Sequence, residues 1–141
     1  MITALQAEQF KSWTDTSRIR MAPITGLFGT NSAGKTSILQ LLLLLKQTVE
    51  SADRQRVLHT GDERTYTDLV TFFDMIHAHQ IPNTLTISIA WKLAKEFQIL
   101  DPIDEKRLLF SIPELYFLTA IKGTDEGISV ERFEYAFQTS S

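Results

Sequence analysis

The sequence predicts an α/β fold in which a strand, a loop and a helix are followed by a mainly antiparallel β subdomain. Residues 24–28 form an apolar run that ends at Gly29, as expected of a buried strand that enters a tight loop. Residues 36–49 contain no Gly or Pro, and their apolar side chains lie on nearly all sides of a helix. This helix is expected to be buried between a sheet and another layer. Residues 85–91 alternate apolar and polar side chains, which predicts a strand with one buried face.

The other elements are predicted by the same rules. Residues 2–9 are compatible with a short strand, and residues 66–80 place apolar side chains at helical spacing, which favours a short helix. The rest of the expected order is a half-buried strand at 18–21, a polar connector at 51–65, and two strands at 115–121 and 128–137 joined by a hairpin loop at 123–127.

The composition is that of a soluble globular domain. The 141 residues are 43% hydrophobic and 22% charged, which provides a core and excludes wholesale disorder. No apolar run approaches the ~18 residues of a membrane span, and the first ten residues do not resemble a signal peptide. The absence of cysteine excludes disulfides, iron–sulfur ligation and thiolate zinc sites. We therefore expect a cytoplasmic protein without membrane contact.

The net charge of −3 is unevenly distributed. Residues 1–60 hold seven Lys/Arg against four Asp/Glu, a net +3, whereas residues 61–141 hold seven against thirteen, a net −6. A basic first half is suited to an anionic ligand. The acidic second half argues against a broad nucleic-acid-binding face, so DNA contact is possible in principle but not indicated by charge.

Residues 29–36 read G-T-N-S-A-G-K-T and match the phosphate-loop motif G-x-x-x-x-G-K-[ST] in full. Gly29 and Gly34 permit close approach of the backbone to a phosphate. Backbone N–H groups and the following helix N-terminus are then expected to bind the phosphates of a nucleoside triphosphate. Lys35 is expected between the β- and γ-phosphates, and the Thr36 hydroxyl on Mg²⁺. The predicted nucleotide-binding residues of this segment are Gly29, Thr30, Asn31, Ser32, Ala33, Gly34, Lys35, Thr36 and Ser37.

A family resemblance is carried by this motif and by the residues on either side of it. Residues 10–13 read F-K-S-W, and the motif has Asn31 at its third position. Together they resemble the N-terminal half of ABC/SMC-type ATPase heads, a group that includes RecF and bacterial ATPases related to overcoming-lysogenization-defect proteins. The nearest likeness, which extends through residues 46–51, is to Septu-like ATPases of anti-phage defence. The resemblance is specific over residues 1–51 and moderate to about residue 91.

The resemblance implies a P-loop NTPase fold, the first lobe of an ABC/SMC-like head. Residues 1–92 would form the nucleotide-binding core and residues 93–141 a β-rich continuation of it. Lys11 and Ser12 would lie beside the phosphates, across from the loop. Two heads would sandwich and hydrolyse ATP, and would regulate an associated nuclease subunit or DNA-processing activity. The alternatives are a regulatory module that binds nucleotide without hydrolysis, a DNA repair ATPase, or an interaction protein with a vestigial loop.

The acidic Walker B strand and the signature motif of such a head are not found in the sequence, so catalytic residues stay unassigned and the chain is expected to be the N-terminal portion of a larger ATPase. Residues 69–74 resemble a Walker B strand, but Met75 follows Asp74 where a catalytic Glu should be. His77 and His79 form an H-x-H pair without an evident third metal ligand. Weaker candidates are Trp13 for stacking on the base, and Arg18 and Arg20 for contact with the nucleotide or a partner, although core packing and solvent exposure explain these residues more simply. By the resemblance, Gln47 and Gln80 are candidates for the glutamine loop of such a head by composition only. The acidic residues Asp101, Asp104, Glu105, Asp125 and Glu126 are candidates for metal binding, but solvated loops explain them more simply.

Overall fold

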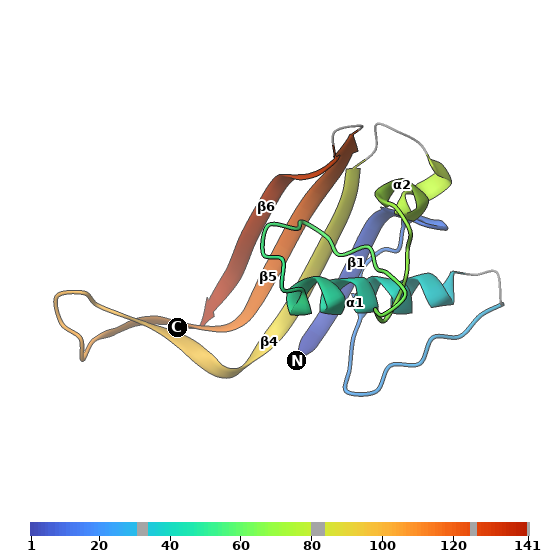
Figure 1. The fold of residues 1–141 in the computed structure, drawn as a ribbon. Coiled ribbons are helices and arrows are strands. Elements are labelled where there is room, and N and C mark those ends of the chain that lie inside the picture. The colour runs from blue at the N-terminus through green and yellow to red at the C-terminus, as the bar shows by residue number, and fades with distance from the viewer. Residues whose placement is uncertain (31–33, 80–83, 125–126, 141) are drawn as a thin grey trace.

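A computed structural model of the chain describes residues 1–30, 34–79, 84–124 and 127–140. Its main feature is a six-stranded antiparallel sheet in the order β2-β1-β4-β5-β6, with the short β3 also pairing with β1 (Figure 1). The strands are β1 (Ile2–Phe10), β2 (Trp13–Asp15), β3 (Ile19–Arg20), β4 (Thr84–Leu100), β5 (Leu108–Thr124) and β6 (Gly127–Ser140). The helices are α1 (Lys35–Glu50), α2 (Phe72–Met75) and the 3₁₀ turn η1 (His77–His79).

The core lies between α1 and one face of the sheet. Leu5 of β1 pairs with Ile89 of β4, which in turn pairs with Phe117 of β5, so their side chains share this face. Figure 1 shows α1 running across the part of the sheet formed by β1 and β4. The buried hydrophobic residues of the core are Leu5, Ala7, Phe10, Ile38, Leu41, Leu44, Leu58, Leu69, Phe72, Met75, Ile76, Leu85, Ile87 and Ile121.

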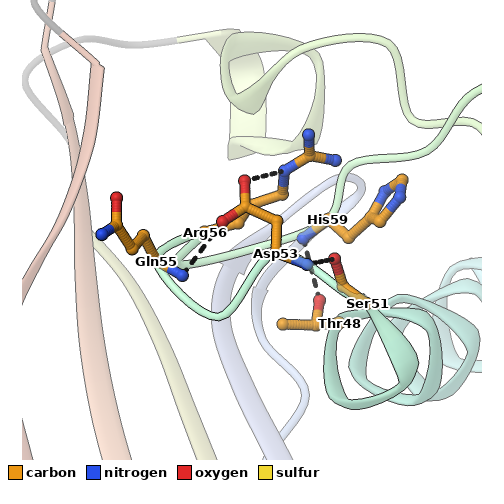
Figure 2. Close-up of polar contacts among 6 residues, drawn as sticks. All are labelled: Thr48, Ser51, Asp53, Gln55, Arg56 and His59. Atoms are coloured by element: carbon orange, nitrogen blue, oxygen red, sulfur yellow. Dashed lines mark hydrogen bonds and ion pairs between the residues drawn. The ribbon is translucent and has the colours of Figure 1, made fainter.

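The segment that follows α1 is ordered by polar contacts with the helix and within itself. Buried Gln47 donates its side-chain N–H to His59 O at 2.5 Å, and its amide oxygen accepts from Thr67 N at 3.1 Å. The Thr48 hydroxyl accepts from His59 N at 2.9 Å, and the Asp53 carboxylate accepts from the next loop residues, as Figure 2 shows. Gln47, a candidate for the glutamine loop of an ABC/SMC-type head, therefore holds this connector on α1.

The predicted α/β fold of a P-loop NTPase, with an ABC/SMC-like first lobe, is wrong. The structure is mostly antiparallel β-sheet, and residues 24–28 do not form the expected buried strand. Ile24 and Phe28 are 93% and 94% exposed. The physical reason is the lack of a partner: in the described residues every strand pairing is antiparallel, and no strand offers residues 24–28 the backbone hydrogen bonds that a buried strand needs.

Three smaller expectations are also corrected. The helix of residues 36–49 exists as α1, but it buries one face only, and Leu39 is 54% exposed. The short helix predicted within 66–80 is reduced to α2 and η1. The half-buried strand at 18–21 is reduced to β3.

The strands predicted at 85–91, 115–121 and 128–137 are confirmed as parts of β4, β5 and β6. Among the described residues, no helix has the length and hydrophobicity to cross a membrane.

Candidate functional site

Among the described residues, no side chain caps the N-terminus of α1. Its N-cap, Gly34, adopts a left-handed conformation (φ 74°, ψ 14°) and supplies no side-chain hydrogen bond to the first turn. The first turn contains no acidic residue. Backbone N–H groups at a helix start lack partners within the helix and carry the positive end of its dipole. This helix end is therefore suited to bind an anion.

The side chain of Lys35 reaches back to the two residues at which the motif begins. Its ammonium donates to the carbonyl oxygen of Gly29 at 2.5 Å and also to that of Thr30. Both partners are neutral carbonyls, so neither compensates the positive charge. The geometry leaves the charge of Lys35 available to an anionic ligand at the loop.

The β1–β2 turn packs directly against Gly34. Trp13 Nε1 donates to Gly34 O at 3.2 Å. A Cβ added to Gly34 would lie 2.4 Å from Ser12 Oγ and 2.6 Å from Trp13 Nε1. The structure therefore brings Ser12 into contact with Gly34, at the end of the motif. Trp13, a candidate for stacking on a base, instead contacts the loop backbone.

Lys11 is held in the same turn by its backbone. It adopts φ 49°, its N–H donates to Met75 O at 2.7 Å, and its carbonyl accepts from His77 Nδ1 at 2.8 Å. His77 Nε2 also lies 3.2 Å from Thr14 Oγ1, at the far side of the turn. These bonds fix the position of Lys11 next to Ser12 without using the charge of its side chain.

Sequence reasoning missed this role of the segment after α2. Ile76 forms an isolated β-bridge with Phe10, and His77 bonds to both ends of the turn. The H-x-H spacing pointed instead to metal binding. His79 stacks on Phe73 with ring centroids 5.0 Å apart, so the two histidines are engaged separately.

The carboxylate of Asp74 is engaged in capping α2. It accepts from Thr71 N at 3.1 Å and from the Thr71 hydroxyl at 2.5 Å. Among the described residues, no group of three or more His, Asp or Glu side chains is placed to hold a metal ion. Thr36 is exposed in the first turn of α1, where its hydroxyl could join phosphate oxygens around Mg²⁺.

The other candidates lie away from the loop or outside the described residues. Arg18 lies over the Tyr116 ring, with its guanidinium carbon 5.7 Å from the centroid. Asp101 forms an ion pair with Arg107 at 3.8 Å, and Asp104 and Glu105 are exposed in the same hairpin loop. Nothing can be assigned structurally to Asn31, Ser32, Ala33, Gln80, Asp125 and Glu126, which are outside the described residues.

Glu114, on the face of the sheet away from α1, has a lowered side-chain pKa. Hydrogen bonds from the Thr3 hydroxyl and then the Tyr116 hydroxyl, at 2.5 and 2.8 Å, lower the pKa of Glu114. Such bonds favour the charged form of a carboxyl group. Because Glu114 alternates in β5 with the core-facing Leu115 and Phe117, it lies on the face away from α1 and takes no part in the loop site.

No protein-family model matches the chain, and no match is found among curated proteins or solved structures.

Proposed function

We propose that the chain binds ATP together with Mg²⁺ through residues 29–36 and the N-terminus of α1. The observation that carries the proposal is a complete phosphate-loop motif that ends at an uncapped helix start, with Lys35 bonded to neutral carbonyls alone among the partners described. A glycine-rich loop and a helix N-terminus together form a cradle for phosphate groups.

In the proposed complex, the ammonium of Lys35 exchanges the carbonyls of Gly29 and Thr30 for oxygens of the β- and γ-phosphates. The exposed hydroxyl of Thr36 contributes one ligand to Mg²⁺, and phosphate oxygens and water contribute the others. Ser12 borders the phosphates because it contacts Gly34, and Lys11 adds a second positive charge from the same turn.

Replacing Lys11 with alanine tests the second charge. A charge-assisted contact contributes about 1.5–3 kcal/mol, so Lys11→Ala should weaken ATP binding roughly tenfold to a hundredfold. AMP binding should change far less, because the lost contact is to the terminal phosphates. Isothermal titration calorimetry with both nucleotides measures the two effects. Equal ATP affinity in wild type and variant would remove Lys11 from the site and leave the loop assignment standing.

The proposal for the chain alone is binding without turnover. The one aspartate that resembles a Walker B residue, Asp74, is bonded to Thr71 as a helix cap. The resemblance to ABC/SMC-type heads supports a wider proposal, in which a second ATPase head supplies the groups for hydrolysis and the cycle regulates an associated nuclease or DNA-processing activity in anti-phage defence. A purely regulatory nucleotide-binding module, or a DNA repair ATPase, is the alternative.

The purified 141-residue chain should therefore show negligible steady-state ATP hydrolysis while it binds ATP. A coupled phosphate-release assay, with Lys35→Ala as the control for contaminating ATPases, measures this. Turnover that is present in the wild type and lost in Lys35→Ala would contradict binding without hydrolysis. Loss of that turnover in Asp74→Asn would then assign the metal to Asp74.

A further inference from the structure

Strand β6 forms an open edge of the sheet and carries a row of exposed aromatic side chains. It pairs with β5 on one side and ends the strand order. Figure 1 shows β6 at the edge of the sheet that lies farther from α1. Phe133, Tyr135 and Phe137 alternate along it and are 65%, 61% and 48% exposed. Tyr135 packs on Phe117 and Phe137 on Phe110, with ring centroids 5.0 and 6.1 Å apart. Because alternate residues of a strand project to the same face, the three rings lie on one face of the sheet.

The backbone of the same three residues faces outward. The hydroxyl of Thr119 in β5 donates to Arg132 O at 3.3 Å, so the carbonyl of Arg132 points toward β5. Backbone groups of successive residues in an antiparallel strand point to alternate sides. The N–H and C=O groups of Phe133, Tyr135 and Phe137 therefore point to the open edge, where a further strand could pair with them.

The pairing of β6 with β5 is regular only over a central stretch. Residues 132–138 pair with residues 120–114 without interruption, and the register shifts on both sides of this stretch. Tyr135 is its midpoint, with one phenylalanine two residues before it and another two residues after it. An antiparallel strand of identical sequence, centred on Tyr135, places an aromatic ring opposite each of the three rings.

We propose that β6 pairs with β6 of a second copy of this chain, antiparallel and about a twofold axis at Tyr135. Phe133 then faces Phe137 of the second copy, and the sheet continues from one copy into the other. Charges do not oppose this register: Arg132 faces Gln138, and Glu134 faces Ala136. Within each copy Glu134 is paired with Arg132, at 3.0 Å from Glu134 Oε1 to Arg132 Nε.

The size of the contact sets the expected strength. An aromatic side chain presents roughly 150–250 Å² when fully exposed, and these three are about half exposed in each copy. Together with one strand edge, this places the interface near the lower limit of about 1,000–1,200 Å² for specific association. An interface of this size is typical of weak, reversible association.

The first test is sedimentation of the 141-residue chain without nucleotide, which keeps the outcome independent of ATP binding. At about 100 μM the chain should be dimeric, and on dilution to about 1 μM it should dissociate. Tyr135→Arg should weaken the dimer at least tenfold, because two positive charges then meet at the axis, and far-UV circular dichroism should show an unchanged sheet. A chain that stays monomeric at about 100 μM, or that forms open-ended larger species, would overturn the proposal.

Disulfide trapping tests the register, and the chain has no cysteine to interfere. Tyr135→Cys should form a disulfide-linked dimer on oxidation, because residues opposite each other with both hydrogen bonds have Cα atoms about 5.5 Å apart, within disulfide range. Phe133→Cys should not, because four residues along the strand separate its two copies by roughly 13 Å. Phe97→Cys, 59% exposed on β4, controls for random oxidation. Equal trapping of all three variants would contradict the proposed pairing.

Discussion

Replacement of Lys35 with alanine should abolish most ATP binding. Its ammonium bonds two carbonyls of the loop, so the substitution removes these bonds and a positive charge at the same time. In the proposed complex the ammonium bonds oxygens of the β- and γ-phosphates. Loss of these two charge-assisted bonds, at about 1.5–3 kcal/mol each, weakens ATP binding by at least about a hundredfold. Calorimetric titration with Mg²⁺ and ATP measures the effect, and the thermal unfolding curve checks that the variant folds.

Lys46→Ala is the matched control for this experiment. Lys46 lies on the same helix, its ammonium is 3.9 Å from the Glu50 carboxylate, and it lies 4.3 Å from the centroid of the Tyr66 ring. The substitution removes the same charge from α1 at a distance from the loop, so ATP affinity should be unchanged. If both variants bind ATP like the wild type, residues 29–36 are not a phosphate-binding loop.

The sequence predicted best the elements whose own residue pattern requires one buried face or strongly favours one backbone conformation. The alternation of residues 85–91 requires one buried face, and β4 indeed packs against α1 with Leu85 and Ile87 buried. The Gly- and Pro-free residues 36–49 have a strong helical preference, and α1 spans them. In both cases the local pattern and the packing agree.

Residues 24–28 show why the fold class was wrong. An apolar run is compatible with a buried strand, but it does not specify the neighbour that must accept and donate the backbone hydrogen bonds. β1 and β4 pair with each other, and β5 follows β4, so the sheet forms entirely from antiparallel neighbours. Ile24 and Phe28 are left exposed. A short motif thus predicted a local loop and helix but not the sheet beside them.

For the candidate site too, the sequence indicated the local segments but not the long-range contacts that position them. The motif spacing predicted Gly34 and Lys35 as phosphate-binding residues, which stays a prediction, and the resemblance placed Ser12 near the loop, where the structure has it in contact with Gly34. The bonds of Lys11 to Met75 and His77 that hold this turn could not be predicted, because they join residues 64 and 66 positions apart through backbone groups of Lys11. Contacts to backbone atoms leave no residue-type signal in a single sequence.

Substitution of Gly34 should damage both the fold of the loop and the binding of ATP. Gly34 adopts φ +74°, and a Cβ there would meet Ser12 Oγ at 2.4 Å and the Trp13 ring at 2.6 Å. The left-handed conformation alone costs a residue with a side chain about 1–2 kcal/mol. Relief of the contact requires the β1–β2 turn to move away from the loop, because the indole of Trp13 is rigid.

Gly34→Ala should therefore lower the free energy of unfolding by about 1–3 kcal/mol and weaken ATP binding roughly tenfold to a hundredfold, the effect of losing one charge-assisted phosphate contact. Gly127→Ala separates the two effects. Gly127 also has a positive φ, +134°, but a Cβ there would meet nothing within 4 Å, and it lies in the β5–β6 hairpin. Its substitution should reduce stability and leave ATP affinity unchanged, as measured by chemical denaturation and by calorimetry. An equal loss of affinity in both variants would mean that instability, rather than the contact of Gly34 with Ser12 and Trp13, determines nucleotide binding.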